Sequence, residues 1–239
     1  MEKFSASVAG RHMACHASAN LDIAIPHWTP PVEDPDADNA ANRGTIMHAW
    51  FAEFQGFPAH DRSNLIRALD YVDKVRNRRR FKALVEEKRI ATWLGTQPST
   101  TADLVLYVAD EMHIFDLKTG KIPVPAVGNE QMLFYAATYG HLAPKAGGVY
   151  LHIVQPWADN IDFWFADAVI IQNFMDDAVV AETAITTGST TFMPGDHCKF
   201  CPANPHGRGA KGKPLCPAMR QVLYPDTTNY DAILGGMDD

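Results

Sequence analysis

The sequence predicts an α/β fold in which a mixed β-sheet is flanked by helices. Of its 239 residues, 46% are hydrophobic and 21% are charged, as in globular chains that bury a core. The apolar spacing is helical up to about residue 80 and then changes to short runs of β-branched and aromatic residues. Helical segments return between and after the later strands, and this order favours a mixed sheet.

The elements follow in order along the chain. Helices are expected at residues 5–19, 45–54 and 65–81, and residues 26–42, which hold four prolines, are typical of a surface loop. Strands are expected at 81–93, 102–108 and 112–117, then a helix at 129–139, strands at 148–155 and 161–166, and a helix at 168–186. We expect one domain over residues 1–239, with its core at about 43–186 and an irregular tail from residue 187.

Charge is strongly segregated, although the net charge is -7. Residues 62–89 hold ten Lys or Arg against four acids, and residues 197–220 hold five basic residues and no acid. Acids gather at residues 22–38 and 159–182. Basic tracts in an acidic chain suit a one-sided contact with a polyanion, and a solvated helix face is the alternative that charge alone leaves open. The expected phosphate contacts are Arg76, Arg78, Arg79, Arg80 and residues 199–220.

No window of the sequence approaches the roughly 20 apolar residues of a membrane span, and the first 21 residues lack the apolar core of a secretory signal. We therefore expect a cytoplasmic protein with no membrane partner. The four cysteines are too few for a disulfide scaffold in a chain of this length, and reduced thiols are available to bind metal.

An acid and a lysine stand two residues apart in the third expected strand. Alternation along this strand places Asp116 and Lys118 on one face. Taken alone, the pair is typical of a surface salt bridge. The preceding strand opens with Asp103, however, and the strand before it carries Glu86 and Glu87. Carboxylates that converge from adjacent strands need a cation between them, and oxygen ligands favour Mg²⁺ or Mn²⁺. A lysine beside such a cation can orient an attacking water.

Five short motifs in order resemble those of RecB-like nucleases of the PD-(D/E)xK superfamily. They are RGTIMH at residues 43–48, Glu87, TAD at 101–103, DLKTG at 116–120 and QMLFY at 131–135. The group includes the CRISPR-associated RecB-like exonucleases, AddB-type nucleases and phage relatives. The resemblance spans almost the whole chain and implies a restriction-endonuclease-like core.

The resemblance also implies roles for the matching residues. The ligands of Mg²⁺ or Mn²⁺ would be His48, Asp103 and Asp116. The other catalytic residues would be Lys118 as the catalytic lysine, Glu87, Gln131 and Tyr135. Gln131 and Tyr135 are four residues apart and therefore share one helix face.

One of these assignments departs from the family pattern, and two have alternatives. Asp116 stands where many relatives carry Glu, which shortens the ligand by one methylene. The upstream acid is Glu86 or Glu87; Glu87 is preferred because Lys-Arg-Ile follows it as in the family, and a solvated partner of nearby arginines is the other interpretation. For His48 taken alone, a structural histidine is the alternative to a ligand.

The cysteines form a split set. Cys198 and Cys201 are separated by two residues, Cys216 follows, and Cys15 lies near the N-terminus. Four thiolates bind tetrahedral Zn²⁺ or an iron-sulfur cluster, and spacing alone does not separate the two.

The distribution of these cysteines resembles the iron-sulfur staple of the same nucleases. It implies a 4Fe-4S cluster that joins residues 5–20 to residues 187–220. The interval before Cys216 is longer than in many relatives and leaves zinc open, with His197 or His206 as a substitute ligand.

These expectations describe a metal-dependent DNA exonuclease that acts on single strands or duplex ends, in phage or bacterial recombination, replication or repair. The implied partners are DNA and a recombinase, helicase or single-strand-binding protein of a bacterial or phage-infected cell. Two other classes stay open: a catalytically inactive DNA-binding accessory and a zinc-stapled structural protein. The clustered acids count against the accessory, because a binding module has no need of carboxylates that face phosphate.

Overall fold

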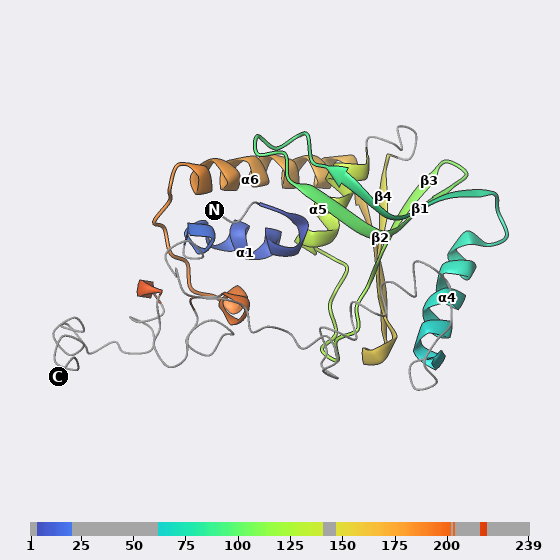
Figure 1. Cartoon of the computed structure of the whole chain (residues 1–239). Helices are drawn as coiled ribbons and strands as arrows, with labels where there is room; N and C mark the ends of the chain where they lie inside the picture. Colours follow the sequence, from blue (N-terminus) through green and yellow to red (C-terminus); the bar gives the residue numbers. More distant parts are fainter. Residues whose placement is uncertain (1–3, 21–61, 141–146, 202, 204–215, 219–239) are drawn as a thin grey trace. The chain divides into compact units, whose positions relative to one another are not determined.

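A five-stranded mixed β-sheet forms the centre of the structure (Figure 1). The computed structural model describes residues 4–20, 62–140, 147–201, 203 and 216–218. These residues fall into two compact units, and each is described by itself. The sheet unit contains the described residues of 4–10 and 62–180, and the cysteine unit contains residues 11–20 with the described residues from 181 onward.

The strands lie side by side in the order of the sequence. They are β1 (Phe81–Ile90), β2 (Ser99–Val108), β3 (Glu111–Leu117), β4 (Gly148–Gln155) and β5 (Asn160–Asp167). Strands β1 to β3 form an antiparallel meander, β4 and β5 are antiparallel, and β3 and β4 are parallel. Parallel neighbours need a crossover, which α5 (Glu130–Tyr139) supplies. The mixed sheet with flanking helices confirms the predicted α/β class.

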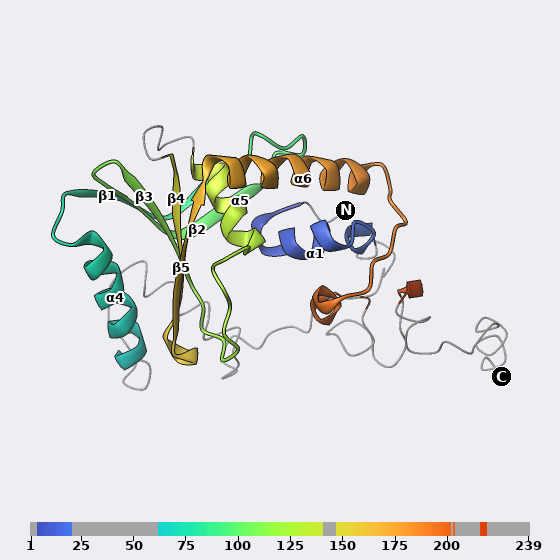
Figure 2. The same ribbon diagram turned by 180° about the vertical axis from the view of Figure 1, so that it is seen from behind.

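Helix α4 (Arg62–Arg76) covers one face of the sheet, opposite to α5 (Figures 1 and 2). Its apolar side chains recur at the three- and four-residue spacing of an amphipathic helix and join one buried cluster with the sheet. The fully buried members of this cluster include Leu65 and Ala68 of the helix, and Leu104, Leu106, Phe115 and Val154 of the strands.

Helix α4 ends at Arg76 rather than at residue 81, where the apolar spacing predicted its end. Asn77 and Arg78 have φ angles of 48° and 57°, in the left-handed region. Such residues terminate a right-handed helix, because the left-handed conformation cannot continue its hydrogen bonding. Phe81 therefore begins β1 instead of ending the helix.

The opposite face of the sheet is covered by α5 and by aromatic side chains from neighbouring segments. The side chain of Asn129 caps α5 and accepts a hydrogen bond from the Met132 amide at 3.1 Å. Phe134 of α5 lies between Phe4 and Trp93, with ring centroids 6.2 and 5.3 Å away. These contacts hold the crossover helix against the sheet.

The remaining helical segments agree only in part with the sequence. Helix α6 (Ala168–Thr186) has the predicted bounds. The helix expected at 5–19 is divided into η1 (Ala6–Val8) and α1 (Ala9–Ala14), with residues 15–17 outside any helix. Two short 3-10 helices, η3 (Pro156–Ala158) and η4 (Asp196–Phe200), were not anticipated. The loop expected at 26–42 and the helix expected at 45–54 lie outside the described residues.

A buried histidine pair lies on the α4 face of the sheet. His113 Nδ1 is 3.0 Å from His152 Nε2, and His152 Nδ1 is 2.8 Å from the Tyr71 hydroxyl. Burial lowers the pKa of His152 to about 3, with a further contribution from His113. Burial also lowers the pKa of His113. Both rings are therefore neutral near pH 7, and one hydrogen bond joins them.

None of the helices in the described part of the chain is both long and apolar enough to cross a membrane.

Candidate active site

Two carboxylates lie where β2 and β3 reach the end of their ladder. The last pair at this end is Leu104 opposite Phe115, so Asp103 and Asp116 stand one step beyond it. Asp103 Oδ2 accepts a hydrogen bond from the Leu117 amide at 2.6 Å and so replaces a ladder partner. Asp103 is 6% exposed and Asp116 is 2% exposed. Buried carboxylates of this kind require partners, because desolvation disfavours their charged form.

Lys118 and Gln131 provide those partners for Asp116. Lys118 Nζ is 2.8 Å from Asp116 Oδ2 and donates to Gln131 Oε1 at 2.8 Å. Gln131 Nε2 donates to Asp116 Oδ1 at 3.1 Å and to the Tyr135 hydroxyl at 2.8 Å. The structure thus brings together Asp116, Lys118, Gln131 and Tyr135, the four residues to which the resemblance gave a common site.

The hydroxyl of Tyr135 stays protonated throughout the physiological range. Burial raises the pKa of Tyr135 strongly, and the negative charge of Asp116 raises it further. The side chain is 5% exposed. A neutral hydroxyl that accepts from Gln131 fixes the amide of Gln131 with its carbonyl oxygen toward Lys118.

The donor chemistry of this site fits a hard divalent cation. Asp103 and Asp116 offer only oxygen atoms, the ligands that Mg²⁺ and Mn²⁺ prefer. Within the described ranges, no three His, Cys, Asp or Glu side chains form a group that could hold a metal ion. A bound cation would therefore need ligands beyond these two carboxylates. His48, the third ligand that the resemblance implied, lies outside the described residues.

The expected acid of β1 lies beside a break in the β1–β2 ladder. Pairing runs to Val85 opposite Leu104 and resumes at Glu87 opposite Ala102, so Glu86 is skipped and stands across from Asp103. Glu86 has a φ of 47° and is exposed. The carboxylate of Glu87 forms an ion pair with Arg89. This pairing matches the alternative in which Glu87 is a partner of a nearby arginine.

Tyr139, which sequence reasoning missed, occupies this break. Its hydroxyl donates to the Glu87 carbonyl and accepts from the Ala102 amide at 3.2 Å, so it stands between two groups that face each other in the ladder. Tyr139 follows Gln131 and Tyr135 at four-residue intervals on the same face of α5. Burial raises the pKa of Tyr139. The continuation of the spacing by one more tyrosine was the available signal.

The four cysteines are buried and free of disulfides. In the cysteine unit, Cys15 Sγ accepts a hydrogen bond from the Met193 amide at 3.5 Å, and Cys198 Sγ accepts one from the Gly195 amide at 3.4 Å. Cys201 and Cys216 share a small apolar cluster with Ala203. Burial raises the pKa of Cys201, and Cys216 and Cys198 contribute to that rise. The structure does not bring the four sulfur atoms together as one ligand set.

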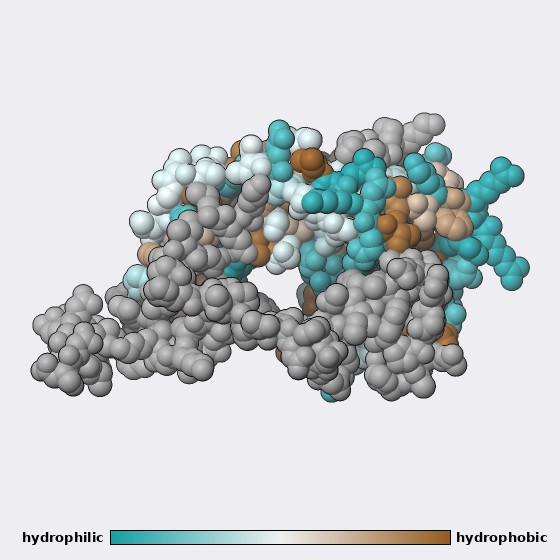
Figure 3. Space-filling view, viewed as in Figure 1, coloured by the Kyte–Doolittle hydropathy of each residue, from teal (hydrophilic) through white to brown (hydrophobic). Residues whose placement is uncertain are grey.

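Within the described part of the basic tract, some arginines form ion pairs and others do not. Arg76 pairs with Asp73 at 2.6 Å and lies over the Phe81 ring, and Arg79 pairs with Glu111 at 2.7 Å. Arg78 and Arg80 are exposed and form no ion pair within the described part of the chain. Hydrophilic side chains project from this connection between α4 and β1 (Figure 3). The basic residues expected at 199–220 lie outside the described side chains.

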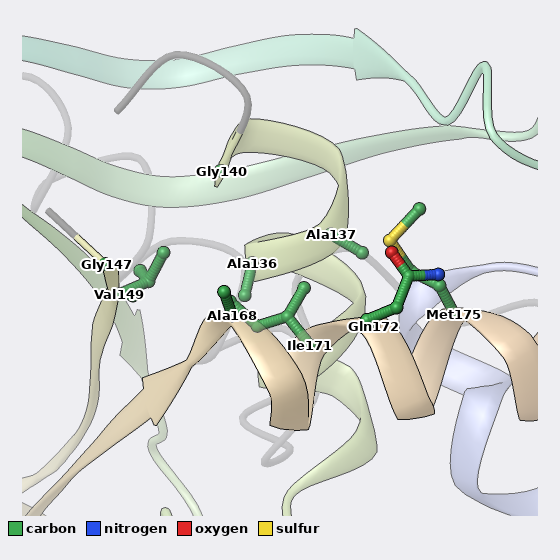
Figure 4. Close-up of a pocket in the computed structure, with 10 residues that line it drawn as sticks. Ala136, Ala137, Gly140, Gly147, Val149, Ala168, Ile171, Gln172 and Met175 are labelled. Carbon is green, nitrogen blue, oxygen red and sulfur yellow. The ribbon is translucent and has the colours of Figure 1, made fainter. Parts of the chain in front are cut away.

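A pocket of about 300 Å³ lies elsewhere in the sheet unit, where α5 and α6 approach the start of β4 (Figure 4). Ala136 and Ala137 of α5 face Ile171, Gln172 and Met175 of α6 across it. Its lining contains no charged side chain. It lies at the end of α5 and the start of β4, whereas Asp103 and Asp116 lie on β2 and β3 and Gln131 lies in the first turn of α5, so it is not part of the candidate site.

The fold and the site together define an α/β protein whose mixed sheet carries two buried aspartates, one of which contacts a partly exposed lysine and glutamine. The chain belongs to the family described as a protein of unknown function (DUF2800), whose model matches residues 67–216. This range contains every described site residue and three of the four cysteines. A solved structure described as the crystal structure of SSO0001 is similar at 15% identity and a TM-score of 0.42, over 80% of this chain and 79% of that chain.

Replacing Tyr139 with Phe tests whether its hydroxyl stabilises the ladder break. Tyr139→Phe leaves the Glu87 carbonyl and the Ala102 amide without their shared partner. We expect urea unfolding to show a loss of about 1–3 kcal/mol in the free energy of unfolding. Tyr107→Phe is the matched control, because none of the residues that the structure describes forms a hydrogen bond with the buried Tyr107 hydroxyl, and its removal should change stability by less than about 0.5 kcal/mol. Equal effects of the two changes would contradict this prediction.

Proposed function

We propose that this protein is a metal-dependent DNA exonuclease of the RecB-like type, acting on single strands or duplex ends. The observation that carries the proposal is the hydrogen-bonded group of Asp116, Lys118 and Gln131 beside the buried Asp103. Anionic oxygens next to a partly exposed lysine suit the binding of a cation and a phosphate together. The five motifs in family order support the same proposal, as does a mixed sheet with α5 crossing from β3 to β4, which is compatible with a restriction-endonuclease-like core.

Lys118 is the residue best placed to act on the attacking water. Its ammonium has three donors, of which one goes to Gln131 Oε1, and it forms an ion pair with Asp116. A remaining donor can orient a water or contact a phosphate oxygen. In the proposed reaction, water adds to phosphorus while the bond to the leaving sugar oxygen breaks, which gives a phosphate monoester and a sugar hydroxyl.

The two aspartates, together with Gln131 and Tyr135 of α5, would position Lys118 and the substrate relative to each other. A bound Mg²⁺ or Mn²⁺ would be held by Asp103 and Asp116 and would supply Lewis acidity toward the phosphate oxygens. Gln131 holds both Lys118 and Asp116, and Tyr135 holds Gln131. Burial of the two carboxylates excludes water from them and strengthens each interaction in the group.

A catalytically inactive DNA-binding accessory is the second candidate function. The exposed Arg78 and Arg80 favour binding to a polyanion irrespective of catalysis. The buried Asp103 and Asp116 favour the nuclease, since carboxylates without a catalytic or metal-binding use repel phosphate.

We further propose that Cys15, Cys198, Cys201 and Cys216 of the cysteine unit, which do not form one ligand set in the structure, are drawn together on binding a 4Fe-4S cluster. Backbone amides that donate to Cys15 and Cys198 are the type of contact that tunes such clusters, and the four cysteines are buried and form no disulfide. Zinc is the alternative with the same sulfur ligands. His197 is a candidate for an additional zinc ligand, because its Nε2 is 3.7 Å from Cys198 Sγ.

Variants that each remove one charged group test the nuclease. We expect Asp116→Asn and Lys118→Met each to lower cleavage of end-labelled DNA by roughly 100-fold or more in Mg²⁺ or Mn²⁺. Lys121→Met, three residues along the same chain segment and exposed, is the matched control and should cleave as the wild type does. Wild-type rates in folded Asp116→Asn or Lys118→Met protein would overturn the catalytic assignment.

Metal analysis of protein purified without oxygen tests the cluster. A cubane with four thiolates contains about four iron atoms per chain and gives a brown protein. We expect Cys201→Ser to lose most of this iron, as measured by iron and sulfide assays. Stoichiometric zinc with negligible sulfide in the wild type would support the zinc alternative instead.

The exposed arginines predict where DNA extends beyond the site. Arg78 and Arg80 lie just before Phe81, which pairs with Val108 of β2. Val108 and Asp103 are five residues apart along β2, a distance of roughly 17 Å in a strand. We expect Arg78→Gln together with Arg80→Gln to weaken DNA binding and to lower the salt slope by about two, as each lost phosphate contact lowers it by about one. Arg79→Gln removes the same type of charge from an arginine that Glu111 already pairs, so its slope should stay close to the wild type. Fluorescence anisotropy at several salt concentrations measures the three slopes.

A further inference from the structure

The loop between Lys118 and α5 is held by polar contacts rather than by a hydrophobic core. Of its side chains at residues 119–128, only Ala126 is buried, and Ile122 and Val127 are 75% and 61% exposed. A segment with so few buried apolar contacts would open easily if nothing else restrained it. This loop joins Lys118 to the helix that carries Gln131, so its position determines whether those two side chains meet.

Gln155, at the end of β4, supplies the restraint. It is 1% exposed. Its Nε2 donates to the carbonyls of Gly120 and Ile122 at 2.8 and 2.9 Å, and its Oε1 accepts from the Val124 amide at 3.0 Å. Asn160 Nδ2 donates to the same Oε1 at 3.1 Å. Both donors and both acceptor sites of the amide are therefore used, three of them on the backbone of one loop.

The neighbouring strand β5 completes the attachment. Asn160 Nδ2 also donates to the Val124 carbonyl at 2.9 Å, and Asp162 Oδ2 accepts from the Ala126 amide at 2.8 Å. The loop is thus suspended from β4 and β5 at residues 120, 122, 124 and 126.

Both ends of this loop connect directly to the candidate site. At its start, the Lys118 amide donates to the Val154 carbonyl at 2.9 Å, the residue before Gln155. At its end, Asn129 Nδ2 donates to the Pro125 carbonyl at 3.2 Å while the Asn129 side chain caps α5. A displacement of the loop would therefore change the position of Lys118 relative to the first turn of α5.

We propose that Gln155 is a positioning residue, which holds the loop at 118–128 so that Lys118 and Gln131 remain in hydrogen-bond contact. The catalytic part of this proposal rests on the proposed nuclease function. Gln155 does not touch the carboxylates, and it acts only through the loop. Misplacement of a catalytic group by about 1 Å can lower a rate by roughly 100-fold, so a small shift of the loop is sufficient to affect catalysis.

The central test compares Gln155→Leu with Gln155→Glu. Leu keeps the approximate volume and removes all four hydrogen bonds, whereas Glu keeps an acceptor for the Val124 amide and loses the two donors. We expect Gln155→Leu to lower kcat for DNA cleavage by about 10- to 100-fold with KM changed by less than about threefold. Gln155→Glu should fall between Leu and the wild type. In a Gln131→Ala background, Gln155→Leu should lower kcat far less, because the contact that it protects is already gone.

Thr138→Val is the control for a general loss of stability. Thr138 is buried on α5, and its hydroxyl accepts from Trp93 Nε1 at 3.3 Å, away from the site. It should lower the unfolding midpoint without changing kcat. An equal loss of kcat in Thr138→Val, or full additivity of Gln155→Leu with Gln131→Ala, would overturn the proposal.

Amide hydrogen exchange tests the positioning independently of activity. In Gln155→Leu we expect faster exchange at residues 118–133, with β1, β2 and β5 protected as in the wild type. Unchanged exchange at Lys118 and in the first turn of α5 would overturn the proposal even if the protein cleaves DNA. If the wild type cleaves no DNA under any metal, the proposed nuclease function fails, and the exchange result alone decides whether Gln155 positions the loop.

Discussion

Asp103 and Asp116 are both buried at the same end of the β2–β3 ladder, and the surrounding structure depends on compensating the energetic cost of burying them. Two neighbouring carboxylates repel, and each loses the solvation that water would provide. The ladder end supplies the Leu117 amide for the first, and Lys118 with Gln131 serves the second. Gln131 reaches the site because the crossover from β3 to β4 brings α5 over the ends of two strands, so the parallel pairing and the polar group depend on each other.

The sequence predicted the features that local patterns determine. Short runs of β-branched and aromatic residues located all five strands, and the four-residue spacing of Gln131 and Tyr135 placed both on one face of α5. The rest depends on contacts between distant segments, about which a local pattern carries no information. Tyr139 inserts its hydroxyl between two strands, and Gln155 binds a loop more than thirty residues earlier. Both side chains are ordinary members of a helix and a strand when viewed along the chain alone.

Charge segregation is a coarser guide than contact geometry. Arg79 belongs to the same basic run as its neighbours, yet it pairs with Glu111, which stands 3.6 Å from the buried His113. The run is therefore partly structural and partly exposed, a division that counting charges cannot make. A similar distinction holds for Glu87, whose carboxylate is engaged by Arg89 two residues later.

The parallel pairing of β3 and β4 has a consequence for the order in which the molecule folds. The meander of β1 to β3 and the pair of β4 with β5 join near neighbours in sequence, whereas His113 opposite Tyr150 joins residues 37 positions apart. Closing the longer loop costs more chain entropy, so the local pairs should form first. Until the crossover closes, Asp116 and Gln131 belong to separate structures. The polar group of Asp116, Lys118 and Gln131 should then be the last part of the molecule to assemble on folding and the first to separate when the crossover opens.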